Sequence, residues 1–298
     1  MSSESPPPLF ERMSSLLDPG RIMLWAMSHY IQVFGETILK GQLLAPFTQT
    51  QKLRDEAFGR FWIDFTTPRQ MSSDPNNTEI PPPVGSSALI PPLLRTASGV
   101  VLDIGPGTGT QMPLLTSPSI TALYGPEPCT SLHGALRAKA EAEGISSKYH
   151  ILSTGVAAAD LVPALRKTSG VVDAYDADPA AGIFDTILCV RVLCSVPQME
   201  KTVDELYAML KPGGRLLVTE HVVNSWRRAK GSFVARVVQG VYTLLGWRWF
   251  IGDCALDRDT EAVLRAAGGG DGWESVELER SFEWSAMPYL SGVLVKRG

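Results

Sequence analysis

The sequence contains few of the features that would place a protein in a membrane, on a nucleic acid or in a secreted form. No run of about eighteen apolar residues occurs in its 298 positions, and the first residues lack the basic start and apolar core of a signal peptide. The net charge is −4 without a dense lysine and arginine block, which argues against a nucleic-acid partner because phosphate neutralisation needs clustered cations. These absences predict a soluble, cytoplasmic protein that acts on a small molecule.

Cysteine is scarce as well. The chain has four cysteines, Cys129, Cys189, Cys194 and Cys254, and they show neither the paired spacing of a metal site nor the density of a secreted disulfide framework. We therefore expect four free thiols in a reducing compartment and no metal ion. The apolar share of 44% is ample for a buried core.

The first third of the chain changes composition twice. Residues 1–15 begin with serine and proline, and we expect a disordered tail there. Residues 16–66 carry apolar residues at near-helical spacing, broken by Gly35, Gly41 and Pro46, which predicts an N-terminal helical cap. Polar residues interrupt its apolar character, so we expect at most a peripheral contact of these helices with an intracellular membrane. Residues 67–94 are proline-rich and predict a loop, either a linker or an active-site flap.

The rest of the chain is organised around an apolar run, 100–104, that passes directly into a glycine-rich loop. This pattern predicts a buried parallel strand, a tight turn and a helix that opens from Thr108. Gly105, Gly107 and Gly109 let a ligand approach the backbone, because a Cβ there would occupy its space. The dinucleotide fingerprint has two residues between its last two glycines, and this loop has one, which favours a ligand without a pyrophosphate.

A second apolar run, 120–124, leads to Glu127, whose carboxylate can accept hydrogen bonds from both hydroxyls of a ribose. Residues 103–109 resemble motif I of the class I methyltransferases that use S-adenosylmethionine, and Glu127 resembles their ribose-binding acid. Residues 184–189 resemble the fourth motif of this class, and residues 210–216 resemble its turn into strand five. The less specific segments 192–196, 220–222 and 252–254 are similar to the microsomal alkyl-thiol methyltransferase family, so that the resemblance covers roughly residues 95–298.

The resemblance implies a Rossmann-like α/β fold with a seven-stranded, mostly parallel sheet and an antiparallel last strand. It implies an S-adenosylmethionine-binding core at residues 95–298 with a helical lid inserted after strand five at 222–262. Gly155 and Val156 stand where the family usually has a carboxylate for the adenine amino group, so we expect backbone groups to bind the adenine. The predicted cofactor-binding residues are Asp103, Gly105, Gly107, Gly109, Glu127, Gly155, Val156, Cys189 and Val190.

Three aromatic residues of the lid, Tyr242, Trp247 and Trp249, are expected to line an apolar acceptor pocket, and simple packing against the N-terminal helices is the alternative. His221 closes strand five beside Glu220 and is a candidate general base, because an imidazole pKa of about 6.5 suits proton transfer near neutrality. Its alternative role is to position a loop. Arg191 follows strand four at a place where the alkyl-thiol family has an apolar residue, and we predict that it takes part in catalysis.

The implied reaction is methyl transfer to a small, largely apolar acceptor in specialised metabolism, either a thiol or a hydroxyl. A thiol with a pKa of about 8.5 needs only weak base assistance, whereas a hydroxyl needs more. Arg191 also motivates an alternative, because a cation beside a sulfonium suits a polarised carbonyl. Under it, the protein is a methyltransferase-like pericyclase or dehydratase that binds S-adenosylmethionine without transferring its methyl group. A cofactor-binding scaffold without catalysis is the third hypothesis. The sequence does not indicate an oligomeric state.

Overall fold

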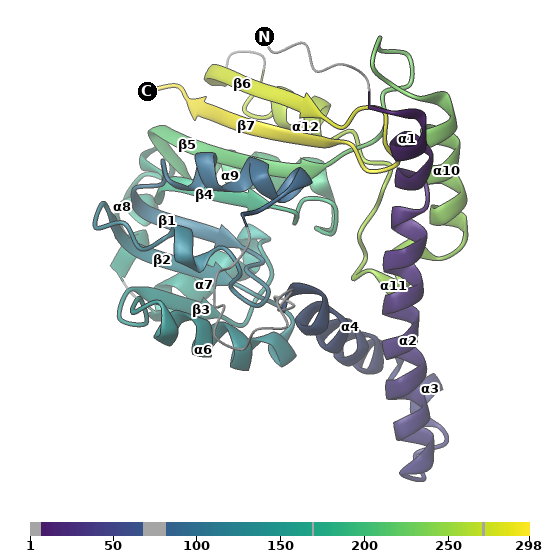
Figure 1. The fold of residues 1–298 in the computed structure, drawn as a ribbon. Helices are drawn as coiled ribbons and strands as arrows, with labels where there is room; N and C mark the ends of the chain where they lie inside the picture. Colours follow the sequence, from purple (N-terminus) through teal and green to yellow (C-terminus); the bar gives the residue numbers. More distant parts are fainter. Residues whose placement is uncertain (1–6, 68–81, 169, 270–271) are drawn as a thin grey trace.

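The computed structural model describes residues 7–67, 82–168, 170–269 and 272–298 (Figure 1). One seven-stranded sheet in the order β3-β2-β1-β4-β5-β7-β6 forms its centre. The first five strands are parallel, and β7 runs antiparallel to both of its neighbours. This confirms the predicted Rossmann-like fold with an antiparallel last strand. The strands are β1 (Gly99–Ile104), β2 (Ile120–Pro126), β3 (Tyr149–Leu152), β4 (Phe184–Val190), β5 (Leu210–His221), β6 (Trp273–Ser281) and β7 (Tyr289–Lys296).

Apolar side chains cover both faces of the sheet, as continuous apolar runs in parallel strands require. Two clusters of buried residues lie on the sheet, one around Phe184 and Leu206 and the other around Leu123 and Leu188. The helices associated with the sheet are α5 (Ile90–Leu94), α6 (His133–Ala142), α7 (Ala158–Thr168), α8 (Asp173–Ala177), α9 (Met199–Met209) and α12 (Thr260–Ala266).

The N-terminal cap lies beyond the carboxyl ends of the parallel strands (Figure 1). It consists of α2 (Asp18–Leu39), α3 (Ala45–Thr48) and α4 (Thr50–Thr66). Helix α2 buries Met23, Ala26, Tyr30 and Val33, a spacing that places all four on one face. The predicted break at Gly35 is wrong, because α2 keeps a buried contact on both sides of it, at Val33 and Thr37.

Three sequence-based expectations in this region need correction. Residues 1–6 lie outside the described residues, but Leu9–Ser15 form helix α1 and are not a disordered tail; Pro8 precedes the helix, where its fixed φ is tolerated. Residues 68–81 are also outside the description, and the predicted loop is helical at η1 (Gly85–Leu89) and α5, which has Pro91 and Pro92 in its first turn. The helix expected from Thr108 is reduced to the turn η2 (Met112–Leu114).

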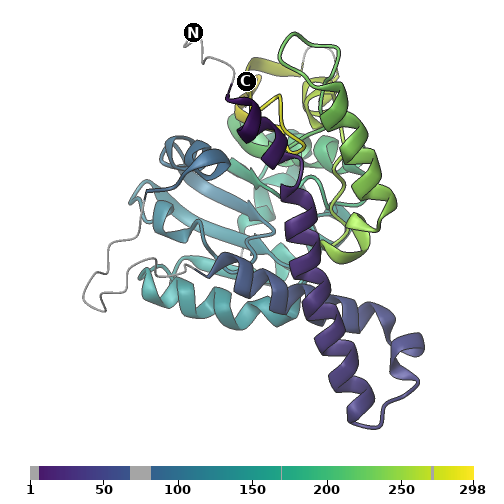
Figure 2. The same cartoon turned by 45° about the vertical axis from the view of Figure 1, so that its right-hand side comes forward.

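The segment after β5 carries α10 (Phe233–Leu244) and α11 (Trp247–Phe250). Figure 2 shows α10, in green, on the same side of the molecule as α2. The side chains of Tyr30 and Arg54 each donate a hydrogen bond to the carbonyl of Trp249, over 2.9 and 3.2 Å, and so join this segment to the cap. Within the described residues, no helix combines the length and the apolar character needed to cross a membrane.

Candidate functional site

The glycine loop after β1 has the backbone that the sequence predicts. Gly105, Gly107 and Gly109 have φ of +55°, +61° and +76°, the left-handed region that favours glycine. A Cβ at Gly107 would lie 2.5 Å from Nε1 of Trp62, and one at Gly105 would lie 2.8 Å from Cγ2 of Val192. The loop is therefore closely approached by side chains of helix α4 and of the segment after β4.

Glu127 joins the end of β2 to this loop. Its Oε2 accepts from the main-chain N–H of Gly107 and its Oε1 from that of Cys129, each over 2.9 Å. Burial raises the pKa of the Glu127 carboxyl, while the two N–H donors act in the opposite direction. Each carboxylate oxygen has a second lone-pair site, so Glu127 can still accept from ribose hydroxyls.

A second buried carboxylate lies at the end of β1. Asp103 accepts a hydrogen bond of 2.7 Å from the hydroxyl of Tyr149, which lies at the start of β3. Burial raises the pKa of Asp103 to about 6, and the nearby charge of Glu127 acts in the same direction. The carboxyl ends of β1 and β2 thus bring two carboxylates to the glycine loop, the position at which open α/β sheets bind ligands.

A small cavity of about 50 Å³ opens between the loop and α4. Ligand pockets typically have about 300–1,000 Å³, so a nucleoside-sized ligand requires α4 to move away from the loop. The hydroxyls of Thr66 and Thr108 are hydrogen-bonded over 2.8 Å and hold α4 in place. The lining residues are Trp62, Phe65, Thr66, Asp103, Ile104, Gly105, Pro106, Thr110, Gln111, Val190 and Arg191.

Arg191 lines this cavity in a left-handed conformation, with φ of +57°. Its Nη2 donates to the hydroxyls of Ser86 and Ser87, over 3.0 Å each, and its guanidinium lies 5.6 Å from the ring centre of Tyr289. Its Nε is buried and finds no hydrogen-bond partner in the described part of the chain. Arg191 therefore has an unused donor for a carboxylate or a carbonyl oxygen.

The remaining predicted cofactor residues reach the cavity only in part. Val190 lines the cavity, but Cys189 is fully buried in the sheet core, where burial raises its thiol pKa, and successive side chains of a strand point to opposite faces. Gly155 and Val156 follow β3, and neither lines the cavity. The structure thus brings together Asp103, the three glycines, Glu127, Val190 and Arg191, and does not bring Cys189 into this group.

His221, the candidate general base, does not line the cavity. Its Nε2 lies 3.1 Å from Sγ of Cys254, in a buried group that also contains Cys194. The neighbouring Glu220 is fully buried and accepts from the main-chain N–H groups of Val192 and Leu193, and burial raises its pKa to about 7. Glu220 therefore fixes the segment after β4, and His221 faces sulfur.

Of the three aromatic residues expected to line one acceptor pocket, Trp247 and Tyr242 pack in one hydrophobic cluster with residues of the cap, and Trp249 does not belong to it. Trp247 is 2% exposed and donates from Nε1 to Sγ of Cys254 over 3.3 Å. Tyr242 donates to the carbonyl of Leu16 over 3.2 Å, and Trp249 lies on the surface with Arg54 4.2 Å above its ring. The alternative prediction, packing against the N-terminal helices, fits these aromatic residues better. Trp247 and Tyr242 lie in a cluster with Met23, and the carbonyl of Trp249 accepts a hydrogen bond from Tyr30 of α2.

Sequence reasoning missed the two cysteines that surround His221. Cys194 follows β4 and His221 ends β5, and adjacent parallel strands end at the same edge of a sheet, so this pair could have been found from the motifs. No sequence motif indicates that Cys254 joins this pair, because Cys254 lies in the segment after α11 and only the folding of that segment brings it to His221. Residues Trp62 and Thr66 were missed for the same reason, since only tertiary packing brings α4 to the glycine loop.

The glycine loop, the acidic residue after β2 and the strand order define a class I methyltransferase fold, and residues 86–250 match the family model described as methyltransferase domain. The chain belongs to this family. The match confirms the predicted recognition and S-adenosylmethionine as the cofactor of its class. The site residues fit that cofactor, since they combine a glycine cradle with buried carboxylates and a free guanidinium donor.

Two curated relatives and one solved structure are similar to the chain. Human thiol S-methyltransferase TMT1B is 31% identical over 121 residues, which are 39% of this chain and 46% of that protein. Phosphatidylethanolamine N-methyltransferase of Cereibacter sphaeroides is 27% identical over 177 residues, 57% of this chain and 74% of that one. The chain thus spans less than half the length of the human relative. The [4+2]-cyclase SpnF superposes with a TM-score of 0.50 at 15% identity, covering 82% of this chain and 96% of that one, and shows the shared fold.

Proposed function

We propose that this chain binds S-adenosylmethionine at the glycine loop and transfers its methyl group to a small, largely apolar thiol. The observation that carries the proposal is the bond between Glu127 and the main-chain N–H of Gly107, which joins a ribose-binding carboxylate to a cradle of left-handed glycines. When bound, the cofactor supplies an electrophilic methyl group on a positively charged sulfur. Such a transfer depends mainly on alignment and on the exclusion of water.

The residues of the site can perform both tasks. Glu127 accepts from the ribose hydroxyls, and Asp103 offers a second buried acceptor at the end of β1. Arg191 offers its free Nε–H to a carboxylate, which the cofactor carries on its amino-acid part. Trp62, Phe65 and Thr66 of α4 line the cavity beside the loop, so their side chains can border the bound cofactor and exclude water from it.

The absence of an imidazole at this cavity favours a thiol over a hydroxyl. His221 faces Cys254, and no histidine is among the described residues that line the cavity. A thiol, with a pKa of about 8.5, is partly ionised near neutrality without help, whereas a phenol has a pKa of about 10. The thiol S-methyltransferase relative supports the same acceptor class, over the part of the chain that it covers.

The alternative is a pericyclase or dehydratase that keeps the methyl group on the cofactor, and Arg191 beside the cavity is the observation that favours it. The two functions differ in their products. Mass spectrometry of incubations with candidate thiols and phenols distinguishes them, because methyl transfer yields methylated acceptor and S-adenosylhomocysteine in equal amounts. A rearranged or dehydrated product with unchanged cofactor supports the alternative.

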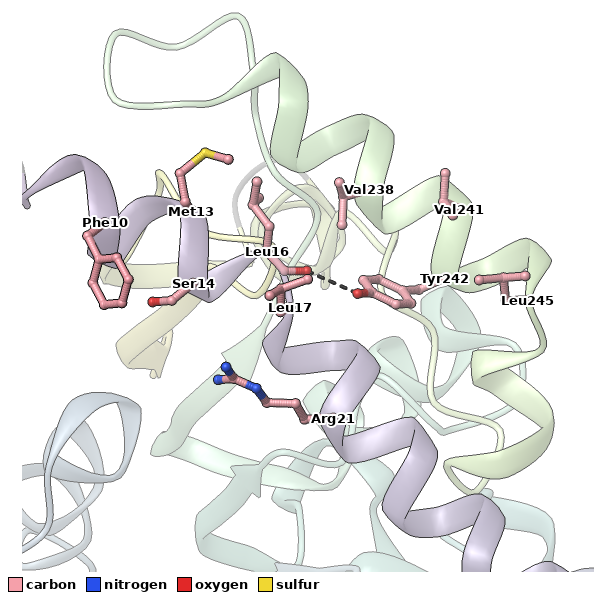
Figure 3. Close-up of a pocket in the computed structure, with 10 residues that line it drawn as sticks. All are labelled: Phe10, Met13, Ser14, Leu16, Leu17, Arg21, Val238, Val241, Tyr242 and Leu245. Atoms are coloured by element: carbon pink, nitrogen blue, oxygen red, sulfur yellow. Dashed lines mark hydrogen bonds between the residues drawn. The ribbon is translucent and has the colours of Figure 1, made fainter.

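We also propose that the outer surface formed by α1 and α10 makes a peripheral contact with a membrane. These helices flank an apolar groove of about 610 Å³ (Figure 3). Its apolar walls are Phe10, Met13, Leu16 and Leu17 from the α1 region and Val238, Val241 and Leu245 from the α10 region. The dashed line in Figure 3 is the bond from Tyr242 to the carbonyl of Leu16, which connects the two walls.

The surroundings of this groove suit a lipid interface. Phe10 is 84% exposed and Leu244 is 89% exposed. Exposure of such apolar side chains to water is unfavourable in free energy, and insertion among lipid acyl chains would remove this cost. The ring of Trp226, in the segment before α10, contacts that of Phe233, the first residue of α10, and the guanidinium of Arg227 lies 4.8 Å above the ring of Trp226. Aromatic rings beside basic side chains are typical of the headgroup region, so anionic lipid should strengthen this contact.

A further inference from the structure

Cys194, His221 and Cys254 form a compact buried group outside the glycine-loop cavity. Their Sγ and ring nitrogen atoms all lie within 4.8 Å of one another. The three residues come from the segment after β4, the end of β5 and the segment after α11. None of them is more than 6% exposed. Three of the chain's eight cysteines and histidines therefore meet at one point.

Main-chain bonds hold the segments that carry these side chains. The N–H of Ala255 donates to the carbonyl of Cys194 over 2.9 Å, which fixes the two cysteine segments side by side. Arg258 donates to the carbonyls of Leu193 and Val196 over 2.5 and 2.7 Å, and its own carbonyl accepts from the N–H of Val223 over 2.9 Å. The group is thus held in place by its backbone, as an ion-binding site requires.

We propose that Cys194, His221 and Cys254 bind one Zn²⁺ ion. Two thiolates and a neutral imidazole are the ligands that zinc prefers, and a Cys₂His set with a further open position is a known zinc arrangement. In a tetrahedral site the ligand atoms lie about 3.5–3.8 Å apart, so the widest separation in the group has to shorten by at most about 1 Å and the 3.1 Å separation between His221 and Cys254 has to open slightly. No additional Cys, His, Asp or Glu within the described ranges joins the group, so these three residues are the protein ligands of the proposed site.

The charge balance suits the surroundings. Two thiolates carry two negative charges, which one Zn²⁺ neutralises, and the resulting neutral site lies among apolar side chains such as Met23, Phe61 and Leu256. Binding converts Zn²⁺, two thiols and the imidazole into the complex and two released protons, without an oxidant or reductant. Nε2 of His221 is the ring nitrogen that faces the sulfur and would bind the ion, which would leave the ring proton on Nδ1, a buried atom without a hydrogen-bond partner among the described residues.

Trp247 supports the site from outside. Its Nε1–H lies 3.3 Å from Sγ of Cys254, and a donor of this kind stabilises a thiolate. Trp247 belongs to α11, and Met23 and Phe61 belong to the cap. A metal ion here would therefore connect the carboxyl ends of β4 and β5 to the lid and to the cap.

The test uses the full chain and Zn²⁺ alone, without a methyl donor or acceptor. We expect elemental analysis to find about one zinc per chain after purification, and titration of the metal-free protein to release about two protons per ion bound. Cys194→Ser and Cys254→Ser should each weaken zinc binding at least about 100-fold, while Cys129→Ser, a cysteine outside the group, should bind like the parent. Trp247→Phe keeps the apolar bulk and should weaken binding about tenfold.

Replacement of zinc by Co²⁺ gives a second readout in the folded parent protein. A thiolate-to-metal absorption band should appear in the near ultraviolet and should be lost in the two serine variants. The proposal is overturned if the folded parent binds no zinc, if the serine variants bind it as the parent does, or if mass spectrometry finds a Cys194–Cys254 disulfide. Calorimetry with S-adenosylmethionine is run separately, so a failure of the cofactor site is distinguished from a failure of the metal site.

Discussion

The main-chain N–H of Gly107 donates to Oε2 of Glu127 over 2.9 Å and so joins the loop after β1 to the end of β2. Gly107 lies at φ +61°, with Trp62 directly above it. We therefore expect two roles for Glu127: it supports the glycine loop, and it accepts hydrogen bonds from the ribose hydroxyls.

Gly107→Val and Glu127→Gln should each weaken S-adenosylmethionine binding. The valine side chain would collide with Trp62 and strain a left-handed backbone. The Glu127→Gln amide keeps one acceptor but loses the charge, and a hydrogen bond to a charged group contributes about 1.5–3 kcal/mol, or roughly 10- to 150-fold in affinity. Calorimetry measures both. Parental affinity in variants whose circular dichroism is unchanged would mean that the cofactor binds elsewhere.

The stability of the protein should fall as pH rises from about 4 to about 6. The pKa of Asp103 is about 6 in the fold against about 3.9 in the unfolded chain, so the native state holds more protons over this interval. Below pH 4 the protonated Asp103 contributes to the free energy of unfolding, and this contribution is lost as the carboxyl ionises. A pKa shift of about two units corresponds to about 3 kcal/mol. Glu127, whose pKa burial also raises, acts with the same sign.

Asp103→Asn tests this dependence, because the amide oxygen can still accept from Tyr149 and no longer titrates. Urea unfolding at a series of pH values should show a smaller decrease between pH 4 and pH 6 in the variant. An identical pH profile in parent and variant would show that Asp103 has an ordinary pKa.

Thr66→Val should raise the apparent affinity for the cofactor. Its hydroxyl bond to Thr108 holds α4 against the loop, in a state whose cavity of about 50 Å³ is too small for the cofactor. Loss of about 1 kcal/mol from the closed state corresponds to up to about fivefold tighter binding. Thr67→Val is the matched control, because the Thr67 hydroxyl, directly after α4, donates to the carbonyl of Ile63 in that helix. Weaker cofactor binding by Thr66→Val would instead mean that the bond between Thr66 and Thr108 stabilises the cofactor-bound state.

Phe10→Glu and Leu245→Glu should reduce binding to lipid vesicles, because each places a charge in the groove between α1 and α10. Flotation with phosphatidylcholine vesicles, with and without phosphatidylserine, measures the effect, and the anionic lipid should increase binding of the parent. Val84→Glu is the control, since Val84 is 79% exposed but lies outside that groove. A parent protein that stays free of both kinds of vesicle would contradict the membrane contact.

The sequence predicts the sheet and the glycine loop well, because their signals are local. Apolar runs that end in glycines or acidic residues were enough to place Asp103, Gly107 and Glu127 together. Hydrophobic periodicity also identified the cap, although it could not show that the stripe of α2 continues past Gly35.

The details that the sequence could not supply depend on contacts between distant segments. The position of Trp62 above Gly107 follows from the packing of α4, and the contact of His221 with Cys254 follows from the path of the chain after α11. For the same reason the sequence predicts one pocket for the three lid aromatics, whereas in the structure Tyr242 and Trp247 pack in a cluster with the cap and Trp249 lies on the surface under Arg54.

The fate of the cofactor's methyl group tests methyl transfer to a thiol most directly. The protein is incubated with S-adenosylmethionine labelled in its methyl group and a small apolar thiol, and both products are followed by mass spectrometry, with Glu127→Gln in parallel. We expect labelled thioether and S-adenosylhomocysteine in equal amounts, with the rate reduced in Glu127→Gln at limiting cofactor. An acceptor that is converted while the cofactor keeps its label would contradict methyl transfer.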